Sequence, residues 1–409
     1  MTRANPRPRA AAPAGGRRLP FELAPALSVL GLVVVAVVSF GLLGGSLPSI
    51  PGGPNGPDGP IRSPTPSNVV VIPDDPRANI PGSLLYVKDG NVWVQSGDTA
   101  RQLTNGGNDS MPAWAPDGSQ IYFVRTASES GKWPSGGVVR TYNLQVPSLV
   151  RLNADASGIA DVLLTGRIKR NGNTWSYFIR EPSISPDGTT AAIVSDGPDP
   201  STGDIVVKLV DLASGDLTNP RLGQTESLGH QDPAWAPDGK SLLYVRNARE
   251  GARGTPAIYR YNVVTAKSTA LTGPGYTAPS WSRDGRFVAA TKTSTFGTDV
   301  VILDGKTGAE LLRVTRDEAS FSPVWSPKGD SIAFFRVTHG LVDAYLAPLT
   351  GTGPEWTAGE SLPLTVSAGL EAASRPAWFI PAEQLPPLPT PTPAVSPGTS
   401  GVPASSTAP

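Results

Sequence analysis

The chain has 409 residues, and its 34 Lys and Arg balance 34 Asp and Glu. Nucleic-acid binding proteins hold phosphates through an excess of basic side chains, so this balance argues against a nucleic-acid partner. The chain has no cysteine, which excludes disulfides and lipid attachment through a cysteine. A sizeable hydrophobic core must therefore stabilise any folded domain.

The N-terminus combines a basic segment, residues 1–22, with an apolar run at 23–43. The run holds 21 residues and no charge, long enough as a helix to cross a hydrocarbon core of about 30 Å. Five Arg precede it, which places the N-terminus in the cytoplasm by the positive-inside rule. We expect a single-pass protein of the cell membrane whose remaining chain is extracytoplasmic. A cleaved signal peptide is the alternative, although its apolar core is usually only about 7–15 residues.

Two segments of low complexity flank the rest of the chain. Residues 44–82 are rich in Pro and Gly, which favours an extended linker over a packed core. Residues 382–409 are rich in Pro, Ser and Thr and are expected to form a disordered tail. An O-glycosylated or envelope-penetrating stalk is the alternative for that tail.

Between these segments a short phrase recurs. Its copies are PAWAPDGSQIYFVR (112–125), PSISPDGTTAAIVS (182–195), PAWAPDGKSLLYVR (233–246), PSWSRDGRFVAATK (279–292) and PVWSPKGDSIAFFR (323–336), with a partial copy, PAWFIP, at 376–381. In each full copy a Gly-containing turn, usually with Pro and Asp, joins two β-rich runs. A spacing near fifty residues indicates one supersecondary unit per repeat.

Two further landmarks complete each unit. A third apolar run follows the phrase, and a fourth run ends in Leu-Thr or Val-Thr, as at Leu103-Thr104 and Leu271-Thr272. Four short antiparallel strands, here called A to D, are the blade of a β-propeller. The first unit lacks strand A, so 376–380 should supply it, which would close the ring and remove its free edges. The fold class is therefore all-β: a six-bladed β-propeller of four-stranded antiparallel blades over residues 83–381.

The W-S/A-P-D-G turn, the following β-rich strand and the Leu-Thr ending together resemble the repeats of the TolB-like propellers, a WD40-like family with a PD-G repeat. The resemblance implies a six-bladed propeller and, in TolB itself, binding to the Pal lipoprotein. TolB also has a small α/β domain before its propeller, whereas residues 46–82 of this chain offer no room for one.

Candidate chemistry in the sequence is sparse. The two histidines, His230 and His339, lie in different units and match no metal-ligand spacing. A histidine alone in a loop is usually a solvated side chain. Acidic residues of the A–B turns, such as Asp117 and Asp187, are expected to stabilise those turns, and the repeated Trp should pack between blades. No metal, cofactor or catalytic residue is predicted.

Loop lengths indicate where a partner could bind. In an antiparallel blade the A–B and C–D connections emerge on one face of the disc, and the B–C and D–A connections on the other. The long segments 126–146, 166–181, 219–232, 247–256 and 366–375 all fall on the B–C and D–A face, and only 350–361 breaks the rule. Length variation on one face of a repeat protein is typical of a binding surface.

The two long segments of the second unit mix cations with aromatic residues. The predicted binding residues are Lys132, Trp133, Arg167, Lys169, Arg170, Trp175, Tyr177 and Arg180, and Arg140 lies among them. Such a surface suits an acidic peptide, a glycan or lipid headgroups. The alternative is a self-packed lid whose aromatic rings cover the blade.

Together these features predict a membrane-anchored, non-enzymatic module of the cell envelope that binds a protein or glycan partner. Two alternatives stay open. An enzyme could use the central funnel of the propeller, as some TolB-like lyases do, or the chain could be an extracytoplasmic sensor with a short cytoplasmic N-terminus.

Overall fold

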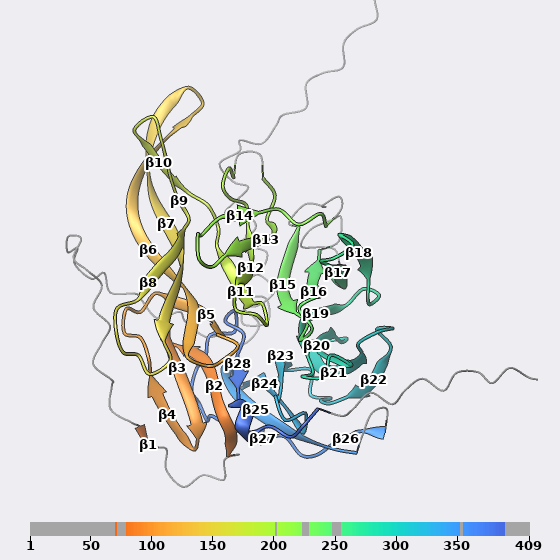
Figure 1. Ribbon diagram of the computed structural model, residues 1–409. Helices are drawn as coiled ribbons and strands as arrows, with labels where there is room; N and C mark the ends of the chain where they lie inside the picture. Colours follow the sequence, from red (N-terminus) through yellow and green to blue (C-terminus); the bar gives the residue numbers. More distant parts are fainter. Residues whose placement is uncertain are drawn as a thin grey trace, which may run out of the picture.

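A computed structural model describes residues 79–200, 203–222, 229–247, 255–351 and 355–388, together with the short strand Val70–Val71. Six antiparallel sheets are arranged around a central axis (Figure 1). This confirms the predicted six-bladed propeller. The predicted membrane segment 23–43 lies outside the described residues, as do most of the linker and most of the tail. The described part contains no helix with the length and apolar character needed to cross a membrane.

Each blade is a sheet whose strand A lies nearest the axis. Blade 1 contains β28 (Ala377–Phe379), β2 (Ile80–Lys88), β3 (Asn91–Gly97), β4 (Thr99–Gln102) and β1 (Val70–Val71). Blade 2 contains β5 (Asp109–Trp114), β6 (Gln120–Ser135), β7 (Val138–Asn153) and β8 (Asp161–Thr165). Blade 3 contains β11 (Arg180–Ile184), β12 (Thr190–Ser195), β13 (Val206–Asp211) and β14 (Leu217–Thr218).

The second half of the disc repeats this order. Blade 4 contains β15 (His230–Trp235), β16 (Ser241–Arg246), β17 (Ala257–Asn262) and β18 (Lys267–Ala270). Blade 5 contains β19 (Tyr276–Trp281), β20 (Phe287–Thr293), β21 (Thr298–Asp304) and β22 (Glu310–Arg313). Blade 6 contains β23 (Ser320–Trp325), β24 (Ser331–Thr338), β25 (Leu341–Thr350), β26 (Thr357–Ala358) and β27 (Leu362–Pro363). One further two-stranded sheet, of β9 (Arg167–Arg170) and β10 (Asn173–Ser176), lies outside the blades.

The ring closes through the C-terminal strand, as the sequence predicted. β28 pairs antiparallel with β2, with Trp378 opposite Leu84. The Trp378 indole donates a hydrogen bond to the Pro81 carbonyl at 2.7 Å, and the Trp114 indole donates to the Ala377 carbonyl at 3.1 Å. A Cβ on Gly118, which has φ +72°, would lie 2.2 Å from the Phe379 ring. The closing strand therefore packs closely against blades 1 and 2.

The hydrophobic core consists of six clusters, one at each contact between neighbouring blades. The strand-A tryptophans lie in these clusters, which confirms their predicted role. Trp325, for example, packs with Phe287, Val300 and Phe334 between blades 5 and 6. Burial of such large apolar side chains at about 25 cal/mol per Å² is the main force that holds the blades together.

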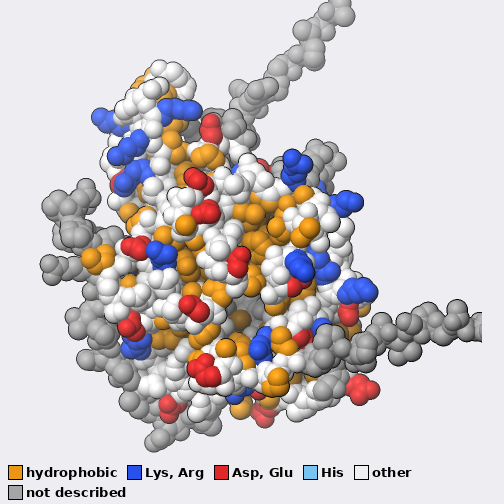
Figure 2. Space-filling model, viewed as in Figure 1, with side chains coloured by type: hydrophobic (Ala, Val, Ile, Leu, Met, Phe, Trp, Pro, Cys, Tyr) orange, Lys and Arg blue, Asp and Glu red, His pale blue; other side chains and the backbone are white. Residues whose placement is uncertain are grey.

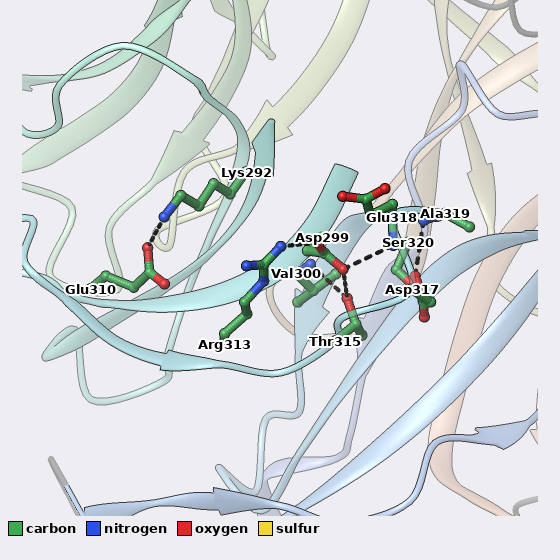
Figure 3. Close-up of polar contacts among 10 residues, drawn as sticks. All are labelled: Lys292, Asp299, Val300, Glu310, Arg313, Thr315, Asp317, Glu318, Ala319 and Ser320. Atoms are coloured by element: carbon green, nitrogen blue, oxygen red, sulfur yellow. Dashed lines mark hydrogen bonds and ion pairs between the residues drawn. The ribbon is translucent and has the colours of Figure 1, made fainter. Parts of the chain in front are cut away.

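The Leu-Thr landmark is explained by a buried hydrogen bond. In four blades the threonine hydroxyl accepts from a backbone N–H in the first half of strand C, for example from Val300 to Thr315 and from Ala344 to Thr365, at 3.0 and 2.9 Å. In blade 5 the Thr315 hydroxyl also donates to Asp299, and Asp299 pairs with Arg313 and accepts from the Glu318 N–H (Figure 3). The landmark thus fixes where strand D ends and the next blade begins.

The A–B turns use their acidic side chains as predicted. Asp117 accepts from the Ser119 N–H at 3.0 Å, and Asp238 accepts from the Lys240 N–H at 2.9 Å. The hydrogen bond from the Ser119 N–H holds the pKa of Asp117 below its usual value. The hydrogen bond from the Ser185 hydroxyl does the same for the pKa of Asp187. Within the described residues no group of three or more His, Cys, Asp or Glu could hold a metal ion.

The boundaries of the propeller differ from those read in the sequence. Strand β2 begins at Ile80 rather than near residue 83, and Val70–Val71, inside the predicted linker, pairs with the outer edge of β4. After β28 the described chain continues past residue 381 through a short 3-10 helix, η4 (Ala382–Gln384), to Leu388. Leu385 contacts the cluster between blades 6 and 1.

Candidate functional site

Within the described residues, an arm projects from blade 2 alone. Strands β6 and β7 pair along their whole length, from Gln120 opposite Asn153 to Ser135 opposite Val138, whereas β8 pairs with β7 only up to Ser148. The part beyond this pairing, residues 126–147, extends past the disc together with β9 and β10 (Figure 1). We call these three segments the arm.

The sequence identified this region as long loops, but it is two hairpins. Its strands are interrupted by polar side chains and do not form the continuous apolar runs of the other blades. The sequence pattern of a blade strand is therefore missing there. One signal was available: Gly136 and Gly137 have φ of 58° and 81°, and a Gly-Gly pair between two β-rich runs is typical of a two-residue hairpin turn.

The β9–β10 hairpin covers one face of β6 and β7. A Cβ on Gly131 would lie 2.7 Å from the Thr174 carbonyl oxygen, so only glycine allows the two layers to approach this closely. Trp175 packs against Trp133, with ring centroids 6.2 Å apart, and contacts the Tyr142 ring edge-on at 4.9 Å. The Arg167 Nε donates to a Glu129 carboxylate oxygen at 2.8 Å across the same interface. These rings and the Arg167–Glu129 contact therefore hold the two hairpins of the arm to each other.

The predicted binding residues do not all gather at one place. Lys132, Lys169 and Arg170 are exposed on the arm, where basic side chains stand out in Figure 2. Tyr177 is buried in the core between blades 2 and 3, and this burial raises its pKa. Arg180 lies on strand A of blade 3, where its guanidinium is 3.5 Å from Glu181. Tyr142, which is not among the predicted binding residues, completes the aromatic cluster.

Exposed apolar side chains lie on the same side of the disc as the arm. Val138 and Val139 at the arm tip are 61% and 55% exposed, and Phe296, in the B–C turn of blade 5, is 89% exposed. Val337 and Leu341 in the B–C hairpin of blade 6 are also exposed. Because B–C connections share one face of the disc, the arm tip and these residues border a common surface.

A second group of interacting residues lies at the axis. The residue before the strand-A proline has φ near +50° in five blades: Met111, Glu181, Asp232, Ala278 and Ser322. Each of these strands carries a register shift at this point. This bulge turns the backbone N–H toward the neighbouring blade. Asp232 N–H donates to Glu181 at 2.6 Å, and Ala278 N–H donates to Asp232 at 2.8 Å.

Arg375, at the same position in blade 1, crosses the axis. Its guanidinium lies 3.6 Å from Asp232 and donates to the Pro279 carbonyl at 2.6 Å. Burial raises the pKa of Glu181, and the nearby Arg180 and Arg375 oppose that rise. Both axial carboxylates are thus engaged by backbone N–H groups and guanidinium groups. Their arrangement tightens the contacts between blades 3, 4, 5 and 1.

We expect Arg375→Met to destabilise the propeller by about 2 kcal/mol at pH 8, because it leaves Asp232 and Glu181 with less positive charge in a largely buried site. Because the pKa of Glu181 is raised in the folded chain, its ionised form destabilises the fold at high pH. This cost falls as the pH decreases and Glu181 takes up a proton. The loss should therefore shrink at pH 5. Urea unfolding at both pH values measures it. Arg170→Met, on the exposed arm, is the control, and an equal loss in both variants would refute the axial role.

The two histidines have different environments. His339 is exposed in the β24–β25 turn, as expected of a loop residue. His230 was also expected to be solvated, which is wrong: it is 2% exposed at the start of β15, packed edge-on against Tyr244 at 4.6 Å. Its Nδ1 accepts a hydrogen bond from the Val207 N–H at 3.2 Å, the contact that a threonine makes in four other blades. Burial, assisted by the charge of Arg246, lowers the pKa of His230 to about 4.

Comparison with known proteins agrees with this architecture. Residues 155–355 match the family model of the TolB β-propeller domain. Two solved structures have a TM-score of 0.51 with this chain: TolB from Acinetobacter baumannii and a putative TolB from Agrobacterium tumefaciens. The first is 20% identical over 73% of this chain and 66% of its own length, and the second is 18% identical over 74% of this chain and 95% of its own. At these identities the likeness concerns the fold, and the six-bladed domain of this chain is a TolB-like β-propeller.

Proposed function

We propose that this protein is a membrane-anchored, non-enzymatic binding module of the cell envelope, whose partner docks on the arm side of the disc. The observation that carries the proposal is the arm itself. Its two hairpins take no part in ring closure, yet a packed aromatic cluster and the Arg167–Glu129 ion pair hold them together. A preorganised projection costs little ordering entropy when it binds.

The chemistry of the arm suits a protein or a glycan partner. Lys132, Lys169 and Arg170 offer exposed cations, while Val138 and Val139 offer an apolar tip. Charged groups around an apolar centre are typical of protein interfaces, where the apolar part supplies affinity and the charges orient the partner. The proposed cellular location rests on the uncharged run 23–43 behind five Arg, which would tether the propeller outside the cytoplasm.

The axis favours binding over catalysis. Glu181 and Asp232 already accept hydrogen bonds from backbone N–H groups of the next blade. A general base must reach the proton that it abstracts, and carboxylates committed in this way have little freedom to do so. His230 is likewise buried against Val207.

The natural absence of cysteine allows a direct test. Single variants Val139→Cys on the arm and Lys240→Cys in an A–B turn of the opposite face would be treated, in intact cells stripped of any wall, with a membrane-impermeant maleimide. Both should react. A heterobifunctional cross-linker on the same cysteines should then join one discrete partner to Val139→Cys alone. If neither cysteine reacts, the extracytoplasmic location is refuted.

Charge reversal should show which face of the disc binds the partner. The triple variant Lys132→Glu, Lys169→Glu and Arg170→Glu should reduce capture of the cross-linked partner at least tenfold, about 1.4 kcal/mol, because all three cations lie on the arm. The matched control reverses the exposed Lys240, Lys267 and Lys306 on the A–B and C–D face. Both triple variants should keep the melting temperature of the wild type. Equal capture by both would contradict docking on the arm side.

A further inference from the structure

A cavity of about 150 Å³ opens between blades 5 and 6 on the face opposite the arm. Its walls come from the A–B turns of the two blades, including Arg283 and Lys328, and from the C–D connection that holds Trp356. That connection, within 350–361, was the one long segment that did not belong to the arm side. The connection is therefore long because it forms a wall of this separate cavity.

Three aromatic rings form the floor of this cavity. Phe287 and Trp325 stack at 6.2 Å, with their planes 17° apart. Trp356 packs edge-on against Phe287 at 4.3 Å and lies 5.4 Å from Trp325. Trp325 is buried, whereas Trp356 is only half-buried and leaves part of its ring accessible. Clusters of this kind, open on one side, bind proline rings in proline-rich recognition domains.

The chain itself reaches the cavity. After η4 the backbone brings Pro386, Pro387 and Leu388 to its edge, where all three line it and are exposed. The Arg283 guanidinium donates a hydrogen bond to the Pro386 carbonyl at 2.6 Å. A polyproline II strand forms no internal hydrogen bonds, so its carbonyls are available to such donors. The contact with Arg283 therefore has the form expected at the beginning of a docked proline-rich strand.

The sequence that follows has the matching chemistry. Residues 386–393 read PPLPTPTP, uncharged and with proline at five of the eight positions. Such a sequence favours polyproline II, and the stiff strand loses little entropy on binding. We propose that the aromatic cavity is a binding site for proline-rich strands, and that residues 389–393 of this chain occupy it in cis. This site is independent of the arm and of the partner that the arm binds.

Continuity favours the chain's own tail over a foreign peptide. Leu388 already lines the cavity, so the next residues are tethered at its entrance. A short tether gives an effective concentration in the millimolar range, which fills even a weak site. A foreign proline-rich peptide would have to compete with that concentration.

Contact quenching of a dye tests the proposal in the full chain. Thr392→Cys, the only cysteine, would carry an oxazine dye whose fluorescence tryptophan quenches on contact. We expect at least twofold lower emission than in a matched chain that also carries Pro389→Ser, Pro391→Ser and Pro393→Ser, which keeps the tail length but loses the polyproline preference. Tenfold dilution should leave the quenching unchanged. Equal emission from the two tails overturns the site, and quenching lost on dilution overturns occupation in cis and assigns the tail to a second copy.

A labelled free peptide of residues 385–397 gives an independent readout. It should bind the chain with the serine tail at least tenfold more tightly than the wild type, because the wild-type cavity is already filled. Trp356→Phe in the serine-tail chain should weaken this binding, and Trp133→Phe on the arm should leave it unchanged. Equal peptide binding by wild-type and serine-tail chains, or equal effects of the two tryptophan substitutions, would overturn the proposal.

Discussion

Deleting residues 376–409 should lower the melting temperature of the propeller by more than about 10 °C. The deletion removes β28, so the inner edge of β2 loses its pairing partner and the contact between blades 6 and 1 loses Trp378. Loss of a buried tryptophan alone costs about 3–5 kcal/mol, and unpaired backbone groups add about 1–3 kcal/mol each. That sum is a large part of the usual 5–15 kcal/mol of a folded domain.

Deletion of residues 389–409 is the control, because every described contact of the C-terminus with the disc lies before that point. It should change the melting temperature by no more than a few degrees. Thermal unfolding followed by circular dichroism and by tryptophan fluorescence would measure both variants. A closing role for β28 could not be maintained if the two deletions gave the same melting curve as the full chain.

The sequence predicted the architecture well because a propeller blade is a local unit. The turn, the strand-A tryptophan and the Leu-Thr ending each have a physical role that repeats: a hydrogen-bonded turn at Asp117, core packing at Trp325, and a buried hydroxyl at Thr315. The shared blade also followed from counting, since one strand A was missing at the start and one was left over at the end. The structure confirms that arrangement in the pairing of β28 with β2.

The functional surfaces were harder to predict because they depend on contacts between distant residues. The arm requires Gly131 to accommodate the Thr174 carbonyl, and the cavity requires Trp356 to meet Phe287 and the Pro386–Leu388 segment. Neither contact leaves a pattern within one repeat. The same reason explains why Tyr177 was predicted as a surface binding residue although it is buried between two blades. The contacts among Glu181, Asp232 and Arg375 at the axis also join residues from different blades.

Blade 3 departs from the other blades in a way that has a consequence for pH. Four blades use a threonine hydroxyl to accept a backbone N–H in the first half of strand C, and a hydroxyl does not titrate near neutral pH. Blade 3 uses the imidazole of His230 for the Val207 N–H. Protonation of Nδ1 would abolish its ability to accept, and it would also place a charge in a buried site beside Arg246. The folded state therefore favours neutral His230.

We expect the propeller to lose stability through this histidine as pH falls from about 6.5 to about 4. The pKa of His230 is about 4 in the folded chain, against a usual value of 6.5. In that interval the unfolded chain binds the proton more readily, so stability rises with pH. At about 1.4 kcal/mol per pKa unit the full effect is about 3 kcal/mol, complete near pH 4 and absent above pH 7.

Comparison of His230→Gln with the wild type isolates this effect. The glutamine amide can accept the Val207 hydrogen bond without binding a proton, so the variant should be less stable than the wild type at pH 7 but lose less on acidification. Burial raises the pKa of Asp196 and Glu371, and these carboxyls stabilise the fold as pH falls, so only the difference between variants is informative. Urea unfolding at pH 7, 5.5 and 4.5 measures that difference, with the exposed His339→Gln as the control. If His230→Gln and the wild type lose stability in parallel, buried His230 is not the group that titrates.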